Sequence, residues 1–292
     1  MRRGGVSVAL EVVRAGVRTT VQDLGRPGFA HLGVPRSGAA DAGALRLANR
    51  LAGNSIDAAG LEILLGGVRL RATRAVTLAV TGAPCQIMVG DRFCDPGLPL
   101  AVPAGALVTI GPAVAGLRVY LAVGGGITVP QVLGSRSTDT LSGLGPDPVR
   151  DGDVLPIGPV TALPPGVDIA PYPPPAGSLR LRVWLGPRDD WFTSSALATL
   201  FAAEYRVSAE TDRVGARLTG PALTRAVEGE LPSEGLVLGA IQVPADGQPL
   251  IFLADHPTTG GYPVVGVVDP GDVDLLGQAR PGTPVSFINA RR

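Results

Sequence analysis

The sequence predicts a mainly β protein, that is, a β-rich α+β fold with few short helices. Of its 292 residues, 45% are hydrophobic and only 17% are charged, while 41 are Gly and 28 are Pro. Glycine and proline at this frequency favour tight turns, which join many short strands more readily than long helices. A chain of this length can form one large domain or two domains of ordinary size.

The expected strands are short apolar runs bounded by Gly, Pro or Asp. The clearest runs cover residues 76–80, 117–123, 179–185 and 249–253. Helical periodicity is rarer. One helix is expected after Ser37 and Asp41, with apolar residues on one face and a stop at Gly53, and a second over residues 194–201.

A proline-rich segment divides the chain. Residues 159–177 are dense in proline and show little periodicity, which is typical of a linker or an extended crossover. We therefore predict an N-terminal half over residues 1–160, a connection over residues 161–178 and a C-terminal half over residues 179–292.

The charged residues exclude several classes of function. All 25 basic residues are Arg, and they balance 25 acidic residues to a formal net charge of zero, so no electrostatic case for nucleic acid exists. The absence of Lys from the sequence excludes Schiff-base chemistry, a P-loop phosphate clamp and a Ser-Lys amidase centre. It also removes any attachment site for biotin or lipoate, so no covalently bound cofactor is expected.

Metal binding and membrane insertion are not expected either. Cys85, Cys94, His31 and His256 are the only cysteines and histidines, and they form no metal-ligand cluster of recognisable spacing. No stretch of about 18 apolar residues runs without a break, and no signal peptide is evident. We expect a cytoplasmic protein that does not enter a membrane.

The first candidate site is the glycine-rich stretch over residues 18–54. It combines amide, carboxylate, guanidinium, imidazole and hydroxyl groups with glycines that let backbone N–H groups approach a ligand. The groups are those of Gln22, Asp23, Arg26, His31, Arg36, Ser37 and Asp41. A network of turns held by Asp–backbone and Arg–carbonyl bonds explains the same pattern equally well.

The second candidate covers residues 124–139, where a glycine triplet follows a strand and precedes Ser135, Arg136, Ser137 and Asp139. A glycine run after a strand can bind an anion through its N–H groups. The alternative is a β-turn with Arg136 in a local ion pair. No GxGxxG opens a helix here, so a dinucleotide site is excluded.

The third candidate covers residues 233–262 and is the expected active surface of the second half. Its polar residues are Glu234, Gln242, Asp255, His256, Thr258 and Thr259, followed by two glycines. Asp255 and His256 cannot form a relay by adjacency alone, because neighbours on a strand point to opposite faces. A lone His is more often structural than a base, although its ordinary pKa suits catalysis near neutrality.

These stretches resemble a family that is named variously as the C-type subunit of 5-oxoprolinase (PxpC), allophanate hydrolase subunit 2, the C/D-type carboxyltransferase subunit (a biotin-dependent carboxyltransferase-like group) or KipA, the antagonist of KipI. The similarity extends over nearly the whole chain. It is carried by residues 19–41 (TTVQDLGRPGFAHLGVPRSGAAD), 45–54 (LRLANRLAGN), 61–67 (LEILLGG), 121–127 (LAVGGGI), 133–139 (LGSRSTD), 211–218 (TDRVGARL), 233–249 (SEGLVLGAIQVPADGQP) and 258–263 (TTGGYP).

The resemblance implies two cyclophilin-like β-barrel halves and a heteromeric complex, a heterotetramer or larger, with a KipI-like B-type subunit. Together with a separate lactam-opening A-type subunit, the complex would use ATP with Mg²⁺ to convert 5-oxo-L-proline to L-glutamate. Phosphorylation of the lactam oxygen would make the addition of water and C–N cleavage easier, because the unmodified amide is resonance-stabilised.

The resemblance also suggests roles for residues. Carboxylates could transfer protons or hold magnesium, arginines could bind carboxylate or phosphate oxygens, and the TTGGYP motif could contact a ligand through its backbone. The catalytic candidates are Asp23, Glu234 and Asp255, and the candidates for substrate or nucleotide binding are Gln22, Arg26, His31, Arg36, Ser37, Arg136, Ser137, Gln242, Thr258, Thr259, Gly260, Gly261 and Tyr262. Arg188 and Val264 replace a Gln and a Lys that are usual in the family.

Two other functions stay open. The chain could be the carboxyltransferase component of a urea carboxylase, with the biotin carrier on another polypeptide, or a binding protein of the KipA type that sequesters a kinase inhibitor. Literal allophanate hydrolysis is rejected, because its Ser-Ser-Lys chemistry needs a Lys that the sequence lacks.

Overall fold

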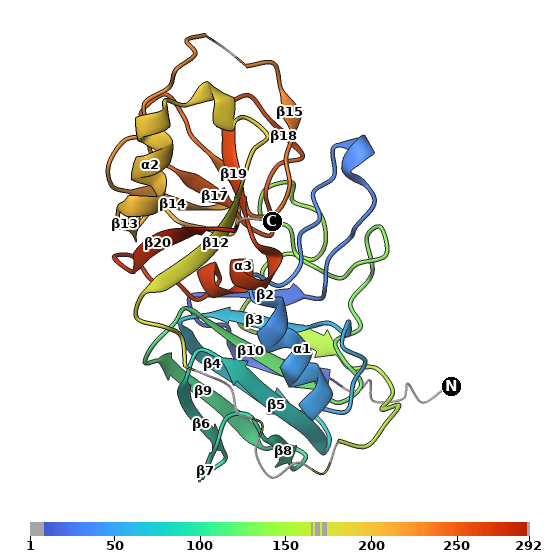
Figure 1. Ribbon diagram of the computed structural model, residues 1–292. Coiled ribbons are helices and arrows are strands. Elements are labelled where there is room, and N and C mark those ends of the chain that lie inside the picture. Colours follow the sequence, from blue (N-terminus) through green and yellow to red (C-terminus); the bar gives the residue numbers. More distant parts are fainter. Residues whose placement is uncertain (1–8, 165, 167–169, 171–173, 230, 291–292) are drawn as a thin grey trace. The chain divides into compact units, whose positions relative to one another are not determined.

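The computed structural model describes residues 9–164, 166, 170, 174–229 and 231–290, and its described elements are mostly strands (Figure 1). The described residues contain three α-helices and two short 3-10 helices. The predicted mainly β class is confirmed. The helices predicted after Asp41 and over residues 194–201 are confirmed as α1 (Ala42–Leu51) and α2 (Ser194–Ala202).

The chain divides into two compact units that are each discontinuous in sequence. The first unit draws on Met1–Gly25, Ala42–Thr138 and Gly143–Pro175, and the second on Arg26–Asp41, Asp139–Ser142 and Ala176–Arg292. The last boundary between the two units, between Pro175 and Ala176, lies within the predicted connection at residues 161–178. The two short segments that the first half contributes to the second unit were not expected, because sequence periodicity does not report which core a loop packs against.

The first unit contains two antiparallel sheets. One has the order β11-β1-β4-β9-β6-β7 and the other the order β2-β3-β10-β5-β8. Their strands are β1 (Ala9–Arg14), β2 (Arg18–Gln22), β3 (Gly60–Leu64), β4 (Gly66–Ala72), β5 (Val76–Gly82), β6 (Cys85–Val89), β7 (Arg92–Cys94), β8 (Pro99–Val102), β9 (Leu107–Ala113), β10 (Arg118–Val123) and β11 (Val154–Pro156). Instead of the closed barrel that the resemblance implied, the described residues of this unit form two sheets.

One hydrophobic core joins these two sheets, because each strand turns alternate side chains inward. Leu70 and Ile110 from the first sheet, and Leu61 and Leu121 from the second, are fully buried in the same cluster. Helix α1 packs against β5 and β10, with Thr81 Oγ1 donating a hydrogen bond to the Ala44 carbonyl at 2.7 Å. Helix α1, which lies in the first candidate stretch, is thereby held against β10, the strand that leads into the second.

The second unit is a closed barrel with the order β12-β19-β16-β17-β14-β13-β20. Only the β12–β20 pairing is parallel among the described strands of this barrel. The elements of the unit are η1 (Ala30–Leu32), β12 (Leu179–Leu185), η2 (Asp189–Trp191), β13 (Tyr205–Val207), β14 (Gly215–Thr219), β15 (Glu234–Gly235), β16 (Ala240–Gln242), β17 (Leu250–Phe252), β18 (Thr259–Gly260), β19 (Val264–Val268), α3 (Pro270–Leu276) and β20 (Pro284–Asn289), besides α2. The barrel predicted for this half is confirmed; its likeness to cyclophilin stays a prediction.

Helix α3 was missed by the sequence prediction although its start carries clear signals. The Asp269 side chain accepts a hydrogen bond from Gly271 N at 3.0 Å, and Pro270 occupies the first turn. The helix is only seven residues long and packs against β12. Among the described residues, no helix is long and apolar enough to cross a membrane.

Candidate functional site

Asp23 is the centre of a polar network in the first unit. Its Oδ1 accepts hydrogen bonds from the hydroxyls of Ser135 and Ser137, each at 2.6 Å, and from Gly25 N at 2.8 Å. Its Oδ2 accepts from Arg136 N at 2.6 Å. The structure thus brings the first and second candidate stretches together, and both oxygens of the predicted catalytic carboxylate already have donors.

The glycine triplet at residues 124–126 forms a turn, as the alternative interpretation held, and does not present an anion site. The N–H groups of Gly124, Gly125 and Gly126 donate to Thr77 O, Asn54 Oδ1 and Val123 O, each at 2.8 Å. A Cβ on Gly125 would lie 2.2 Å from the Gly158 carbonyl oxygen. Glycine is needed here for close backbone packing, so the anion hypothesis for this run is wrong.

Arg136 and Gln22 also belong to this unit. The Arg136 side chain is half-buried and donates from Nε to the Val129 carbonyl at 2.9 Å, so the local partner is a carbonyl and not the ion pair of the alternative interpretation. Gln22 is fully buried and donates to Thr20 Oγ1 and to the Thr138 carbonyl. Gln22, at the end of β2, therefore holds the segment around Thr138 against this strand, and its side chain is closed to solvent.

Asp255 is the centre of a second polar network, which lies within the second unit. Its carboxylate accepts from Arg213 Nε and Nη2, both at 2.9 Å, and from Ser37 Oγ at 2.9 Å. It also accepts from the backbone N and the hydroxyl of Thr140, at 2.9 and 2.7 Å. One buried side chain of the third candidate stretch thus binds a residue of the first stretch and the residue that directly follows the second.

The pKa of Asp255 is lowered despite its burial. Burial raises this pKa, but the charge and hydrogen bonds of Arg213, together with the two donors of Thr140, outweigh that effect. Asp255 is thus a charged, fully hydrogen-bonded group at neutral pH. Such a carboxylate holds chain segments in place and is a poor proton acceptor, because protonation would break several hydrogen bonds.

The remaining candidates of the first stretch differ widely in accessibility. Arg26 is almost fully buried, and its Nη1 lies 3.9 Å from Asp139 Oδ2, whose side chain is equally buried. Asp41 is also buried and accepts from Gln278 Nε2 at 2.8 Å. Arg36 and His31 are exposed, with His31 on the short helix η1. Only these last two can meet a ligand without a rearrangement.

His256 is buried except for 6% of its surface and packs near the Phe252 ring. Its Nδ1 lies 2.7 Å from the Pro257 carbonyl, so Nδ1 carries the proton, because a carbonyl only accepts. Burial lowers its pKa, as does the nearby charge of Arg36, against the opposing effects of the Pro257 carbonyl, Asp255 and Asp139. The imidazole is therefore neutral near pH 7.

Glu234, the third predicted catalytic carboxylate, forms a bidentate ion pair with Arg188. Arg188 Nε lies 3.0 Å from each carboxylate oxygen, and its Nη2 also donates to Oε1. The hydrogen bond with Arg188 is the main cause of the lowered pKa of Glu234. Arg188, which stands where the family usually has Gln, therefore provides the ion-pair partner of Glu234.

The TTGGYP motif forms a small two-stranded ribbon, in which β18 pairs with β15 and places Gly260 opposite Glu234. The Thr258 carbonyl accepts from Leu236 N at 2.9 Å, and Thr259 and Gly261 are exposed. Buried Gln242 donates from Nε2 to the Tyr262 carbonyl at 2.9 Å. A Cβ on Gly260 would lie 2.7 Å from that nitrogen, so this glycine allows Gln242 to approach the ribbon.

Sequence reasoning missed three residues of these networks: Arg213, Thr140 and Arg225. Arg213 lies in the TDRVGARL motif and Thr140 directly follows the LGSRSTD motif. The sequence therefore pointed to both segments, but not to the part that these two residues play in binding Asp255. Arg225 has no motif around it. Its guanidinium carbon lies 5.8 Å from the centre of the Tyr262 ring.

The predicted set does not fit a nucleotide with magnesium. The triplet N–H groups and the three candidate carboxylates are all engaged within the protein, and the described residues contain no group of three or more metal-ligating side chains. Burial raises the pKa of the Cys85 thiol to about 11, so this thiol stays protonated at neutral pH. We therefore derive no chemical step through a metal, a nucleotide or a thiolate in this chain.

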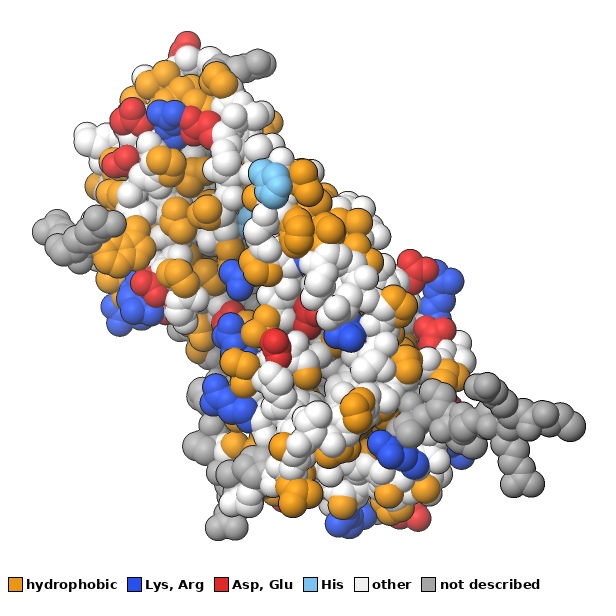
Figure 2. All heavy atoms as spheres, turned by 90° about the vertical axis from the view of Figure 1, so that its right-hand side faces the viewer, with side chains coloured by type: hydrophobic (Ala, Val, Ile, Leu, Met, Phe, Trp, Pro, Cys, Tyr) orange, Lys and Arg blue, Asp and Glu red, His pale blue; other side chains and the backbone are white. Residues whose placement is uncertain are grey.

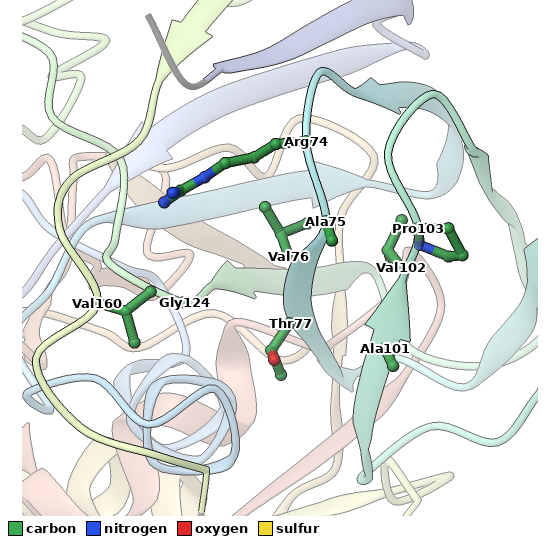
Figure 3. A pocket seen from close by; sticks show the side chains of 9 residues that line it. All are labelled: Arg74, Ala75, Val76, Thr77, Ala101, Val102, Pro103, Gly124 and Val160. Atoms are coloured by element: carbon green, nitrogen blue, oxygen red, sulfur yellow. The ribbon is translucent and has the colours of Figure 1, made fainter.

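A cavity of about 580 Å³ lies in the first unit, away from the predicted site residues (Figure 3). Figure 3 shows Val76 and Thr77 on β5 between Arg74 and Val160 on one side and the end of β8 on the other. The lining residues are Arg74, Ala75, Val76, Thr77, Ala101, Val102, Pro103, Gly124 and Val160. Apolar groups dominate this lining, and Gly124 is the one lining residue that comes from a candidate stretch.

Charged side chains form no single-sign patch on the face that Figure 2 shows. Acidic and basic groups of the described residues are scattered there among apolar and neutral ones, in keeping with the formal net charge of zero.

Comparison with known proteins agrees with this description. The family model "Carboxyltransferase domain, subdomain A and B" matches residues 32–289. The chain is 38% identical over 282 residues to the C-type subunit of Escherichia coli 5-oxoprolinase and covers 90% of that protein. It is 34% identical to urea amidolyase of Lachancea kluyveri, of which it covers 17%.

The crystal structure of Kluyveromyces lactis urea carboxylase is similar to 99% of this chain, with a TM-score of 0.91 and 29% identity. This chain spans only 28% of that protein, so it corresponds to one part of the larger relative. The chain belongs to the carboxyltransferase-domain family, subdomains A and B, which the residues of its three glycine-rich stretches had indicated.

Proposed function

We propose that this chain is the C-type subunit of a cytoplasmic, ATP-dependent 5-oxoprolinase. In this proposal it acts in a heteromeric complex, a heterotetramer or larger, with a KipI-like B-type subunit, while the lactam is opened by a separate A-type subunit. The observation that carries the proposal is the extent of the similarity to the E. coli C-type protein, which includes 96% of this chain and 90% of that protein. The similarity thus joins two chains of comparable length.

The geometry supports a role in binding and positioning. Asp23, Asp255 and Glu234 each accept hydrogen bonds on both carboxylate oxygens. A general base needs a free lone pair within reach of the proton that it removes. We therefore propose that this chain holds the substrate, and that the partner subunits supply the groups that activate the lactam.

The proposal places ATP and Mg²⁺ on a partner protein. The phosphates of a nucleotide need several free N–H groups or cations, and magnesium needs oxygen ligands that are not already hydrogen-bonded. In the described part of this chain, the glycine triplet and the candidate carboxylates offer neither. Exposed Arg36 and half-buried Arg136 remain candidates for anion contacts from this chain.

A second candidate function is the carboxyltransferase component of a urea carboxylase. Its support is the similarity in fold to K. lactis urea carboxylase, with a TM-score of 0.91 over 99% of this chain. The carrier of biotin would then be another polypeptide, because this sequence has no Lys. A binding protein of the KipA type is the third candidate, and it would have no turnover.

Co-expression of this chain with its B-type and A-type partners tests the proposal. The purified complex should release ADP and L-glutamate from ATP and 5-oxo-L-proline, and omission of this chain should abolish glutamate release. The same complex should not turn over urea with bicarbonate and a biotinylated carrier. Turnover of urea without 5-oxoproline consumption would support the second function instead.

A pair of variants separates binding from activity. Arg36→Gln alters an exposed cation of the proposed site, while Arg92→Gln alters a cation of β7 in the first unit. We expect the first to lower glutamate release and the second to leave it unchanged, with both complexes intact by size-exclusion chromatography. If the wild-type complex and both variant complexes assemble but release neither ADP nor glutamate, the result would favour the third candidate function, a binding protein of the KipA type.

A further inference from the structure

Arg225 lies in the second unit between β14 and β15, and its backbone is fixed. It forms an isolated antiparallel bridge with Phe192, and its two chain neighbours are hydrogen-bonded to residues 193 and 191. A side chain that starts from a fixed backbone loses less conformational entropy when it binds a ligand. Arg225 is thus anchored in the way that a recognition residue needs.

The guanidinium of Arg225 is held by two neutral groups. Its Nη2 donates to the Val243 carbonyl at 2.7 Å, and its central carbon lies 5.8 Å from the centre of the Tyr262 ring. Tyr262 is itself half exposed. Contact with an aromatic face and one carbonyl orients the planar group, but it does not neutralise the positive charge.

No carboxylate forms an ion pair with Arg225 in the part of the chain that the structure describes. Arg188 and Arg213 of the same unit have bidentate carboxylate partners at 2.9–3.0 Å. In addition, Arg225 Nε is buried and has no hydrogen-bond partner among the described residues. No described carboxylate therefore neutralises the charge of this guanidinium, which suits an anion that a ligand supplies.

Gln242 extends the same site. Its Nε2 donates to the carbonyl of Tyr262, the residue whose ring faces Arg225, while the next residue, Val243, binds Arg225 through its own carbonyl. The bond to Tyr262 orients the Gln242 amide, whose oxygen is an acceptor. A guanidinium over an aromatic ring, with an amide bound to the backbone of the same tyrosine, matches a small ring that carries both a carboxylate and an N–H group.

We infer that Arg225 binds the carboxylate of a cyclic amide acid, in a site completed by the Tyr262 ring and the Gln242 amide. This inference rests on the proposed function and names the residue that recognises the substrate. Arg225 contacts the carboxylate and takes no part in bond breaking. Its loss should therefore act on KM more than on kcat.

The test compares Arg225→Gln with Arg217→Gln in the reconstituted complex. Arg217 lies on neighbouring β14, is half exposed, and pairs loosely with Glu210 at 3.8 Å, so it is a matched control outside the site. The KM for 5-oxo-L-proline should rise about 10- to 150-fold in Arg225→Gln, the range for a lost charge-assisted hydrogen bond. Arg217→Gln should stay within about twofold of the wild type.

A neutral analogue makes the test specific. The carboxamide of 5-oxoproline lacks the charge, so its inhibition constant should be the same in the wild type and in Arg225→Gln. Arg225→Lys keeps the charge without the fork and should show an intermediate KM. If the Arg225→Gln complex fails to assemble, the test uses Arg225→Lys instead. Its preference for 5-oxoproline over the carboxamide should then be smaller than that of the wild type.

Two results would overturn the inference. One is an unchanged KM in an assembled Arg225→Gln complex, and the other is an undiminished preference for acid over amide in Arg225→Lys. A wild-type complex that does not consume 5-oxoproline at all would overturn the proposed function and this inference with it. These outcomes are distinguishable, because only the last concerns the wild type.

Discussion

At the scale of single residues, buried carboxylates in this protein organise loops. Asp23 collects donors from residues 112 to 114 positions away along the chain, and Asp255 bonds Ser37 across 218 positions. A carboxylate that accepts several hydrogen bonds holds its donors firmly. Two of the three carboxylates predicted to be catalytic thus hold together segments that are distant in sequence.

Asp255→Asn should destabilise the protein strongly. The substitution leaves the Arg213 guanidinium buried without its counter-charge, and breaking a buried pair costs roughly 3–5 kcal/mol. Glu210→Gln, which removes the exposed partner of Arg217, should change the free energy of unfolding by no more than about 0.5 kcal/mol. Urea unfolding of the two variants measures both values.

The same pair gives a pH dependence with a definite sign. The pKa of Asp255 is lower in the folded protein than in the unfolded chain, where an Asp has a pKa of about 3.9. Its contribution to stability is therefore complete above about pH 5 and is lost as the pH falls through the folded pKa. An unfolding free energy of Asp255→Asn that declines with acid as steeply as that of the wild type would contradict this assignment.

His256 should titrate below the ordinary range. Because burial lowers its pKa, its imidazole should gain a proton only below the value of about 6.5 that is usual for an unfolded chain. Stability should then fall as the pH drops below about 6.5, since the unfolded state binds the proton first. His31→Gln leaves His256 as the sole imidazole of the sequence, so one NMR titration curve reports it. A midpoint above about 6.5 would refute the prediction.

At the scale of elements, the glycine-rich segments are mainly devices for close packing. The triplet after β10 lies against the Gly158 carbonyl, and Gly260 of β18 lies against the Gln242 side chain. Sequence composition indicated turns in both places, but a turn and a ligand cradle need the same residue type. Only the partners of the N–H groups distinguish the two.

Gly125→Ala and Gly134→Ala form a matched pair that tests this conclusion. Both glycines have positive φ, 96° and 79°, so either substitution strains the backbone by about 1–2 kcal/mol. A Cβ at residue 125 would also meet a backbone oxygen at 2.2 Å, whereas one at residue 134 meets nothing within 4 Å. Thermal unfolding should show a far larger loss for Gly125→Ala. Equal losses would mean that the turn can move away from Gly158.

At the scale of the whole molecule, each unit has its own core but neither is one continuous piece of chain. Residues 26–41 and 139–142 belong to the second unit, where Ser37 and Thr140 bind Asp255 and the Gly38 carbonyl accepts from Arg213. The half predicted from sequence, residues 179–292, therefore lacks part of the second unit.

A fragment of residues 176–292 should be less stable than the same region in the full chain. Loss of the two short segments removes three donors and one acceptor from the Asp255–Arg213 pair. We expect faster amide exchange in β14 and β17, the strands that flank this pair, when the fragment is compared with the intact protein. Equal protection in both would show that the barrel does not need these segments.

The mainly β class and the positions of α1, α2 and the clearest strands could be predicted from the sequence, because turn residues and apolar periodicity act over a few neighbouring positions. The short helix α3 was missed because seven residues give too little periodicity, although its Asp-Pro start was legible. The motifs also identified the family, since they extend along nearly the whole chain.

The tertiary structure alone decided which of these motif residues can act. Asp23, Asp255 and Glu234 look alike as acidic residues of glycine-rich stretches, yet each proved to have hydrogen-bond partners on both oxygens. Arg225, which no motif marked, proved to lack an anionic partner among the described residues. The reason is physical: local sequence sets the backbone, whereas the fate of a polar side chain depends on donors and acceptors brought to it from distant parts of the chain.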